Sequence, residues 1–138
     1  MTPHWKHFVH QADIGVRGIG NDLSEAFTGA ALTLTAVITE PETISAREQI
    51  KIHYEAPDID LLLVDWLNAL VYEMATRKIL FSQFEVNIKG TTLDALCWGE
   101  QIDLQRHHPV VEIKGATYTE LLVRQDNDKW IAQTVVDV

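Results

Sequence analysis

Cysteine and long apolar runs are almost missing from this sequence of 138 residues. Cys97 is the one cysteine, so the chain cannot close an internal disulfide bond, and we expect it to work in a reducing, cytoplasmic compartment. No apolar run comes near the roughly twenty residues that a membrane-spanning helix needs, and no signal-like apolar segment follows the first residues. These absences favour a protein that is neither anchored in a membrane nor exported.

Basic residues are also scarce. Eleven Lys and Arg stand against twenty Asp and Glu, which gives a formal net charge of −9. A field of this sign repels nucleic-acid phosphates, so we expect no strong direct binding of RNA or DNA, and it favours cations or a basic protein partner. The apolar fraction of 46% and the length suit one globular domain over residues 1–138.

Hydropathy patterns predict seven strands and two helices. Apolar residues recur every three or four positions over 23–38 and 59–77, which is typical of amphipathic helices; Asn21, Asp22 or Ser24 caps the first and Asp58 the second. Alternation predicts strands at 4–10, 14–20, 48–54, 79–89, 93–101, 110–124 (interrupted near Gly115) and 129–138, with a loop at 106–109. The order ββαβαββββ predicts an α+β domain in which two helices pack on a mostly antiparallel β-sheet.

Two aspartates stand at otherwise apolar strand positions near opposite ends of the chain. Asp13 precedes the predicted strand 14–20, and Asp137 lies in the last one. A carboxylate in such a place is costly to bury unless a cation or several donors compensate it, and two of them near sheet ends would form the oxygen-rich site that calcium or magnesium prefers. Val138, the last residue given, could add main-chain oxygens. The alternative is that each aspartate caps a turn.

Other candidate sites are weaker. Lys114, in an apolar strand, either contacts a partner or reaction centre or protects a strand edge from aggregation. A zinc site is disfavoured for two reasons. The three early histidines alternate between strand faces, and Cys97 is the one further zinc-type ligand near His107 and His108 in the sequence. The sequence contains neither a serine-nucleophile elbow nor a phosphate-binding loop, and Trp66 is expected in the core.

The sequence resembles the archease family along essentially its whole length. The matching motifs are His10-x-Ala12-Asp13-Ile14-Gly15, Leu23-Ser24-Glu25-Ala26-Phe27, Leu63-Val64-Asp65-Trp66-Leu67-Asn68, Phe81-Ser82-x-Phe84-Glu85-Val86, Gly99-Glu100, His107, Glu112-Ile113-Lys114-Gly115-Ala116-Thr117-Tyr118 and Val136-Asp137-Val138. Each motif is short, but their order and spacing together are specific.

The resemblance implies an accessory protein rather than a stand-alone enzyme. Archeases promote guanylylation and multiple turnover of the GTP-dependent RNA ligase of tRNA splicing and RNA repair. The family's metal ligands fall on Asp13, Asp137 and Val138, with calcium the usual ion and other divalent cations open, and its ligase-activating lysine falls on Lys114. The alternative is a chaperone-like modulator of a tRNA cytosine methyltransferase that acts through an apolar surface. A metal-dependent hydrolase, the third reading, lacks a third acidic ligand or a base beside the pair.

Overall fold

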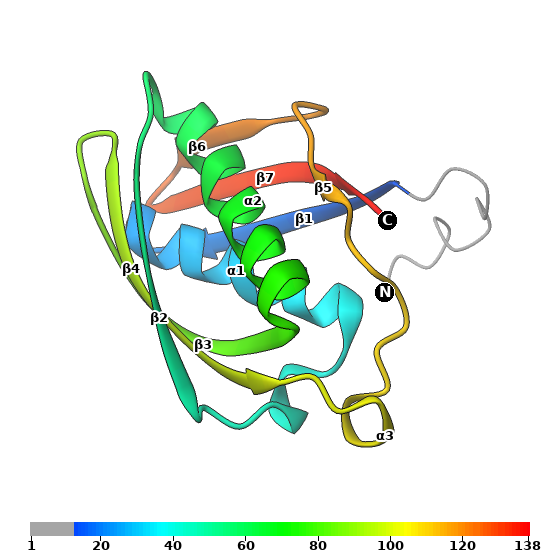
Figure 1. The fold of residues 1–138 in the computed structure, drawn as a ribbon. Helices are drawn as coiled ribbons and strands as arrows, with labels where there is room; N and C mark the ends of the chain where they lie inside the picture. Colours follow the sequence, from blue (N-terminus) through cyan, green and yellow to red (C-terminus); the bar gives the residue numbers. More distant parts are fainter. Residues whose placement is uncertain (1–12) are drawn as a thin grey trace.

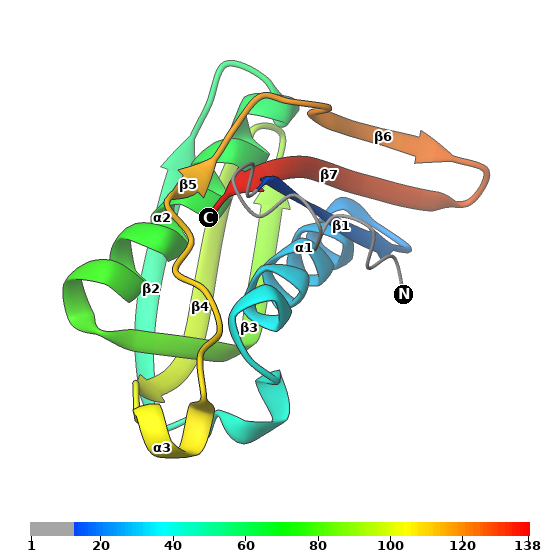
Figure 2. The ribbon, with the colours of Figure 1, turned by 90° about the vertical axis from the view of Figure 1, so that its right-hand side faces the viewer.

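The computed structural model describes residues 13–138, so the strand predicted at 4–10 lies outside the described residues (Figures 1 and 2). The elements run β1 (Asp13–Gly20), α1 (Leu23–Ile38), the short 3₁₀ helix η2 (Pro41–Thr43), β2 (Glu48–Glu55), α2 (Ile59–Arg77), β3 (Ile79–Lys89), β4 (Thr92–Gln101), α3 (Leu104–His107), β5 (Gly115–Ala116), β6 (Leu122–Asp126) and β7 (Lys129–Asp137).

The strands form two antiparallel sheets. In the first, the order is β1-β7-β5, and β6 also pairs with β7; in the second, the order is β2-β4-β3. Helices α1 and α2 each pack against strands of both sheets and fill the space between them (Figure 2). The predicted α+β class with antiparallel strands is confirmed, while the strands are divided between two sheets instead of being collected in one.

Both long helices begin at the residues that the sequence provides as caps. The side chain of Asp22 accepts a 2.8 Å hydrogen bond from the backbone N–H of Glu25, and Asp58 accepts one of the same length from Leu61. These bonds satisfy amides that have no partner within the helix. Helix α2 ends at Arg77 because Lys78 adopts the left-handed conformation, with φ 55°. The predicted helical spans are thereby confirmed.

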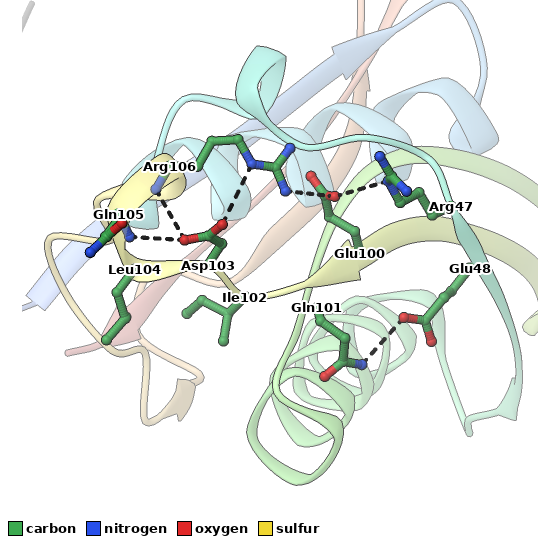
Figure 3. A pocket seen from close by; sticks show the side chains of 9 residues that line it. All are labelled: Arg47, Glu48, Glu100, Gln101, Ile102, Asp103, Leu104, Gln105 and Arg106. Carbon is green, nitrogen blue, oxygen red and sulfur yellow. Dashed lines mark hydrogen bonds and ion pairs between the residues drawn. The ribbon is translucent and has the colours of Figure 1, made fainter.

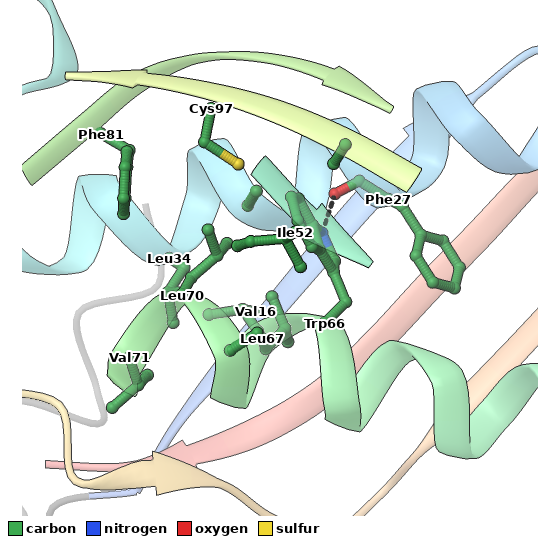
Figure 4. Close-up of a cluster of buried hydrophobic side chains, with 14 of the residues drawn as sticks. Val16, Phe27, Leu34, Ile52, Trp66, Leu67, Leu70, Val71, Phe81 and Cys97 are labelled. Atoms are coloured by element: carbon green, nitrogen blue, oxygen red, sulfur yellow. Dashed lines mark hydrogen bonds between the residues drawn. The ribbon is translucent and has the colours of Figure 1, made fainter. Parts of the chain in front are cut away.

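The core lies between the helices and the two sheets (Figure 4). Trp66 of α2 is fully buried, and its indole N–H donates a 3.0 Å hydrogen bond to the backbone carbonyl of Phe27 in α1, so the two helices are joined by a polar contact inside an apolar interior. Cys97 of β4 belongs to the same buried core, and burial raises the pKa of its thiol to about 12. A protonated, buried thiol is a poor nucleophile.

Strand β1 approaches α1 closely at Gly18. A Cβ atom built there would lie 1.9 Å from the backbone oxygen of Ala26 and 2.2 Å from the backbone nitrogen of Ala30. Neither backbone atom can move without displacing the helix, so this contact requires glycine. The close approach fixes β1, and therefore Asp13 at its beginning, against the helical layer.

Residues 104–124 differ from the prediction. The loop expected at 106–109 begins as the short helix α3, because Asp103 caps it by accepting hydrogen bonds from the next backbone amides; the helix ends where His108 turns left-handed, with φ 48°. The strand expected at 110–124 is reduced to β5 and β6. The interruption expected near Gly115 is wrong, since Gly115 belongs to β5 and the break lies after it, with a turn at Glu120, whose φ is 53°. The stretch 109–113 instead follows the helices, and Val110 donates a 2.9 Å backbone hydrogen bond to Ile38. Within residues 13–138, no helix is long and apolar enough to cross a membrane.

Candidate functional site

Asp13 and Asp137, here called the acidic pair, lie directly opposite one another in the β1–β7 ladder. Asp13 opens β1 and Asp137 closes β7, so both come to the same end of the first sheet (Figure 1). Residues facing each other in an antiparallel ladder have Cβ atoms about 4.5–5.5 Å apart. Both strands alternate inward and outward side chains, and this alternation leaves the two carboxylates on the solvent face. The structure thus brings together two acids that are almost a whole chain apart in the sequence.

The electrostatics of the acidic pair are those of two like charges placed face to face. The pKa of Asp13 is raised above its ordinary value, first by the side-chain hydrogen bond with Asp137, then by burial, and then by the negative charge of Asp137. Like charges opposite one another in a ladder are destabilising unless something compensates them. A shared proton or a bound cation between the two carboxylates relieves this repulsion.

A third segment joins the acidic pair through the backbone. The N–H of Lys114 donates a 2.7 Å hydrogen bond to the carbonyl oxygen of Asp137, and Gly115 lies opposite Asp137 in the β5–β7 ladder. The side chain of Lys114 is exposed. Val138 follows directly and is half-buried, with its side chain packed against the core. All four residues singled out in the sequence therefore meet at one end of the first sheet.

The donor chemistry of this end fits a hard cation. Carboxylate and main-chain oxygens are the ligands of Ca²⁺ and Mg²⁺, whereas zinc sites are built from imidazole and thiolate groups. No group of three or more His, Cys, Asp and Glu side chains suited to a metal occurs among residues 13–138. The acidic pair would supply two side-chain ligands to such an ion, and main-chain oxygens, water or a partner would complete the coordination.

Glu100 is a buried acid that sequence reasoning did not select as functional. Its side chain is 4% exposed, and Arg106 and Arg47 reach its Oε1 atom at 2.8 and 3.4 Å (Figure 3). Oε2 accepts hydrogen bonds from the backbone N–H of Ser45 at 2.7 Å and from His107 Nε2 at 3.1 Å. The pKa of Glu100 is lowered to about 2, mainly by the hydrogen bond from Arg106 and then by that from Ser45.

His107, predicted in a loop, is held in a single orientation by this cluster. The backbone N–H of Asp103 donates to its Nδ1 at 2.9 Å, so the ring hydrogen that faces Glu100 lies on Nε2. The side chain is completely buried. Because both ring nitrogens are engaged in these hydrogen bonds, His107 has a structural role and neither nitrogen is left to bind zinc.

Glu100 and its partners Arg47, Arg106, His107 and Ser45, here called the Glu100 cluster, are separate from the acidic pair. One stretch of chain joins the two features. Residues 108–113 lead from the end of α3 to Lys114. The cluster fixes the start of this stretch, and the hydrogen bond from Lys114 to Asp137 fixes its end. The only sequence signal for the cluster was the presence of Gly99-Glu100 and His107 among the short family motifs.

The family model described as the archease protein family (MTH1598/TM1083) matches residues 5–138. The archease of Pyrococcus abyssi is 35% identical over 139 residues, covering 97% of this chain and 98% of the relative. The archease of Methanosarcina barkeri is also 35% identical over 139 residues, covering 97% of this chain and 95% of the relative.

Two solved structures are also similar. The solution structure of protein 1598 from Methanobacterium thermoautotrophicum has a TM-score of 0.74 at 26% identity, covering 92% of this chain and 93% of that one. The crystal structure of an archease from Thermotoga maritima, described as a possible chaperone, has a TM-score of 0.60 at 20% identity, covering 94% and 93%, and supports the fold alone. Since the family model spans nearly the whole chain and relatives of 35% identity cover 97% of it, the chain belongs to the archease protein family.

Proposed function

We propose that this protein is a metal-binding accessory protein that activates a GTP-dependent RNA ligase in tRNA splicing or RNA repair. The observation that carries the proposal is the meeting of Asp13, Asp137 and Lys114 at one end of the first sheet, where β1, β7 and the stretch before β5 converge. In this role it promotes guanylylation of the ligase and its multiple turnover, and it has no catalytic residue of its own.

The metal site of the proposal consists of the carboxylates of Asp13 and Asp137 with main-chain oxygens of Val138. Calcium is the ion that this all-oxygen set favours, and another divalent cation is compatible with the same ligands. A bound cation would neutralise the two carboxylates and leave coordination positions open toward a partner. The residues of this chain hold and orient that charge, while Lys114, whose backbone is bonded to Asp137 and whose side chain is exposed, contacts the ligase or its nucleotide.

The charge of the molecule suits such a partner. With a formal net charge of −9, the chain is attracted to a basic surface. A ligase that binds RNA and GTP must have such a surface around its active site. The protein itself repels nucleic acid and therefore does not compete for the RNA ends. The outward position of the acidic pair, on a sheet face and at the strand ends, makes it accessible to a ligase active site.

The test is the covalent guanylylation of the partner ligase from labelled GTP, with the ligase limiting. Wild-type protein should raise the yield, and Asp13→Asn or Asp137→Asn should abolish the increase, because each removes one of two charged ligands. Asp128→Asn is the matched control, since Asp128 is an exposed acid in the turn at the opposite end of β7. Full multiple-turnover ligation with Asp137→Asn would refute the proposal.

The contribution of Val138 is tested by lengthening the chain. In a protein that ends at Val138, its carboxylate is available to the ion, and two added residues turn that carboxylate into a peptide carbonyl. Calcium affinity, measured by isothermal titration calorimetry, should fall by about tenfold or more, since a charged ligand is replaced by a neutral one. The same two residues added before Met1 are the control, and equal affinities for the two extended proteins would remove Val138 from the site.

The second candidate is a chaperone-like modulator of a tRNA cytosine methyltransferase. It is favoured by a groove of about 400 Å³ between the end of α2 and the stretch 109–113, lined mainly by apolar side chains. Val110 and Leu104 at this groove are 75% and 69% exposed, so apolar surface is available to a partner. Under this alternative, Val110→Asp should abolish protection of the methyltransferase against aggregation, and a chelator should have no effect. Under the ligase proposal, the chelator is the effective perturbation.

A further inference from the structure

Asn68 connects helix α2 to strand β5. Its side-chain Oδ1 accepts a 2.8 Å hydrogen bond from the backbone N–H of Ala116, and its Nδ2 lies 3.5 Å from the carbonyl oxygen of the same residue. A Cβ atom at Gly115 would lie 3.2 Å from Asn68 Oδ1, which shows how closely the helix approaches the strand. In the sequence, Asn68 falls outside the apolar stripe of the helix, and it is not one of the ligands of the proposed metal site.

The hydrogen bond from the Ala116 amide to Asn68 takes the place of a hydrogen bond to a neighbouring strand, which this amide does not make. Strand β5 has only two residues, and the neighbouring stretch is held to β7 by the amides of Lys114 and Thr117, which donate to Asp137 at 2.7 Å and to Val135 at 2.9 Å. The amide of Ala116 turns toward α2 instead. An unpaired amide in this half-buried strand would be unfavourable, so the side chain of Asn68 completes the hydrogen bonding of β5.

Helix α2 is a rigid support for this contact. Trp66 and Leu67, the two residues before Asn68, are both fully buried, and the indole of Trp66 is bonded to α1. By contrast, a two-residue strand has little stability of its own, and strand segments of this length open readily unless side chains anchor them. The position of β5 is therefore determined by its contacts with α2 and β7.

We propose that Asn68 is a positioning residue for Lys114. By holding the amide of Ala116, it keeps β5 against the end of β7, and thereby holds the lysine two residues earlier beside Asp137 and the acidic pair. Asn68 does not touch the metal ligands' carboxylates or a substrate; it acts through the backbone of β5. The inference rests on the proposed function only in giving Lys114 its task, since the anchoring itself is a property of the free protein.

The first experiment measures anchoring without any ligase. Amide hydrogen exchange is followed by NMR in the wild-type protein and in Asn68→Leu, which has the same side-chain branching but no acceptor. The amides of Lys114 and Ala116 should exchange about tenfold faster or more in the variant, while those of the β1–β7 ladder keep their rates. Asn68→Asp retains the acceptor oxygen and should keep slow exchange. Asn87→Leu, at an exposed position on β3, is the matched control.

The second experiment is a double-mutant cycle on ligase guanylylation. If Asn68 acts through Lys114, then Asn68→Leu should lower the maximal stimulation, and Asn68→Leu combined with Lys114→Met should be no worse than Lys114→Met alone. Losses that multiply would show that Asn68 acts independently of the lysine and would overturn the proposal. Asn68→Asp should restore most of the stimulation.

The two experiments distinguish a failure of the positioning role of Asn68 from a failure of the proposed ligase-activating function. Unchanged exchange of the Lys114 and Ala116 amides in Asn68→Leu overturns the positioning role, whatever the ligase assay gives. Faster exchange combined with a wild-type protein that gives no stimulation overturns the proposed function and leaves only the anchoring. Faster exchange with non-multiplying losses supports both.

Discussion

Replacing Glu100 by Gln tests how much one buried carboxylate contributes to the stability of this fold. The carboxylate is 4% exposed and receives hydrogen bonds or ion pairs from Arg106, Arg47, His107 and the amide of Ser45. Gln keeps the shape but brings an amide group among donors, so at least one of these partners loses its acceptor. The substitution is destabilising because the buried His107 ring and the Ser45 amide lose a charged acceptor, while the Arg106 and Arg47 side chains stay partly in contact with solvent.

The magnitude follows from the lowered pKa. A fall from 4.5 to about 2 means that folding favours the ionised form of Glu100. One pKa unit corresponds to about 1.4 kcal/mol, so the ionised carboxylate contributes on the order of 3 kcal/mol above pH 5. Because the folded-state pKa lies below the unfolded one, this contribution is lost as the pH falls from 4.5 toward 2. About 2 kcal/mol of it should be gone at pH 3.

The assay is urea unfolding followed by tryptophan fluorescence, at pH 7 and at pH 3. For a slope of about 2 kcal/mol per molar urea, the midpoint of Glu100→Gln should lie about 1–2 M below that of the wild type at pH 7, and the difference should shrink by more than half at pH 3. Glu42→Gln, at an exposed glutamate of η2, should leave the midpoint unchanged. Equal midpoints at pH 7, or the same difference at both pH values, would refute the reasoning.

Three further predictions concern other parts of the fold. Trp66→Phe removes the buried hydrogen bond to Phe27 and should lower the free energy of unfolding by about 1–3 kcal/mol in thermal or urea unfolding; an unchanged value would contradict a role for this bond. Gly18→Ala should destabilise the protein by more than about 2 kcal/mol, because its new carbon would lie 1.9 Å from a backbone oxygen of α1, and a wild-type melting temperature would exclude that contact. An NMR titration should place the pKa of His53 above 6.5, since Asp94 accepts its Nδ1–H at 2.7 Å, and Asp94→Asn should lower it; equal values in the two proteins would rule out this cause.

Local patterns predicted most of the secondary structure because they depend on neighbours in the chain. The span of α2 over 59–77 and that of β3 over 79–89 follow from periodicity of three to four and of two, and the caps Asp22 and Asp58 precede the first apolar turn of each helix. The first part of the strand predicted at 110–124 was wrong for the same reason, whereas β5 and β6 fall in its later part. Its alternation suits a strand, but its first half lies along the helices and makes few sheet contacts.

The functional residues also fall into two groups, those that the sequence identified and those that the structure alone revealed. Sequence reasoning selected Asp13, Asp137 and Lys114 from residue type and resemblance, and the β1–β7 register confirms that the two aspartates are neighbours, while their metal remains a prediction. Glu100 and Asn68 were not given roles, because some or all of their partners are remote in the chain: Ser45 is 55 residues from Glu100, and Ala116 is 48 residues from Asn68. No local pattern encodes such contacts.

By itself, the sequence determined the elements, their buried faces, the acidic character of the molecule and the residue types available to a cation. The tertiary structure decided which strands share a sheet, that Asp13 faces Asp137, and that a helix side chain holds the strand next to Lys114. The physical reason is that helices and strands form from interactions a few residues apart. The pairing of strand ends, by contrast, depends on the register of whole strands and on the packing of the helices between two sheets.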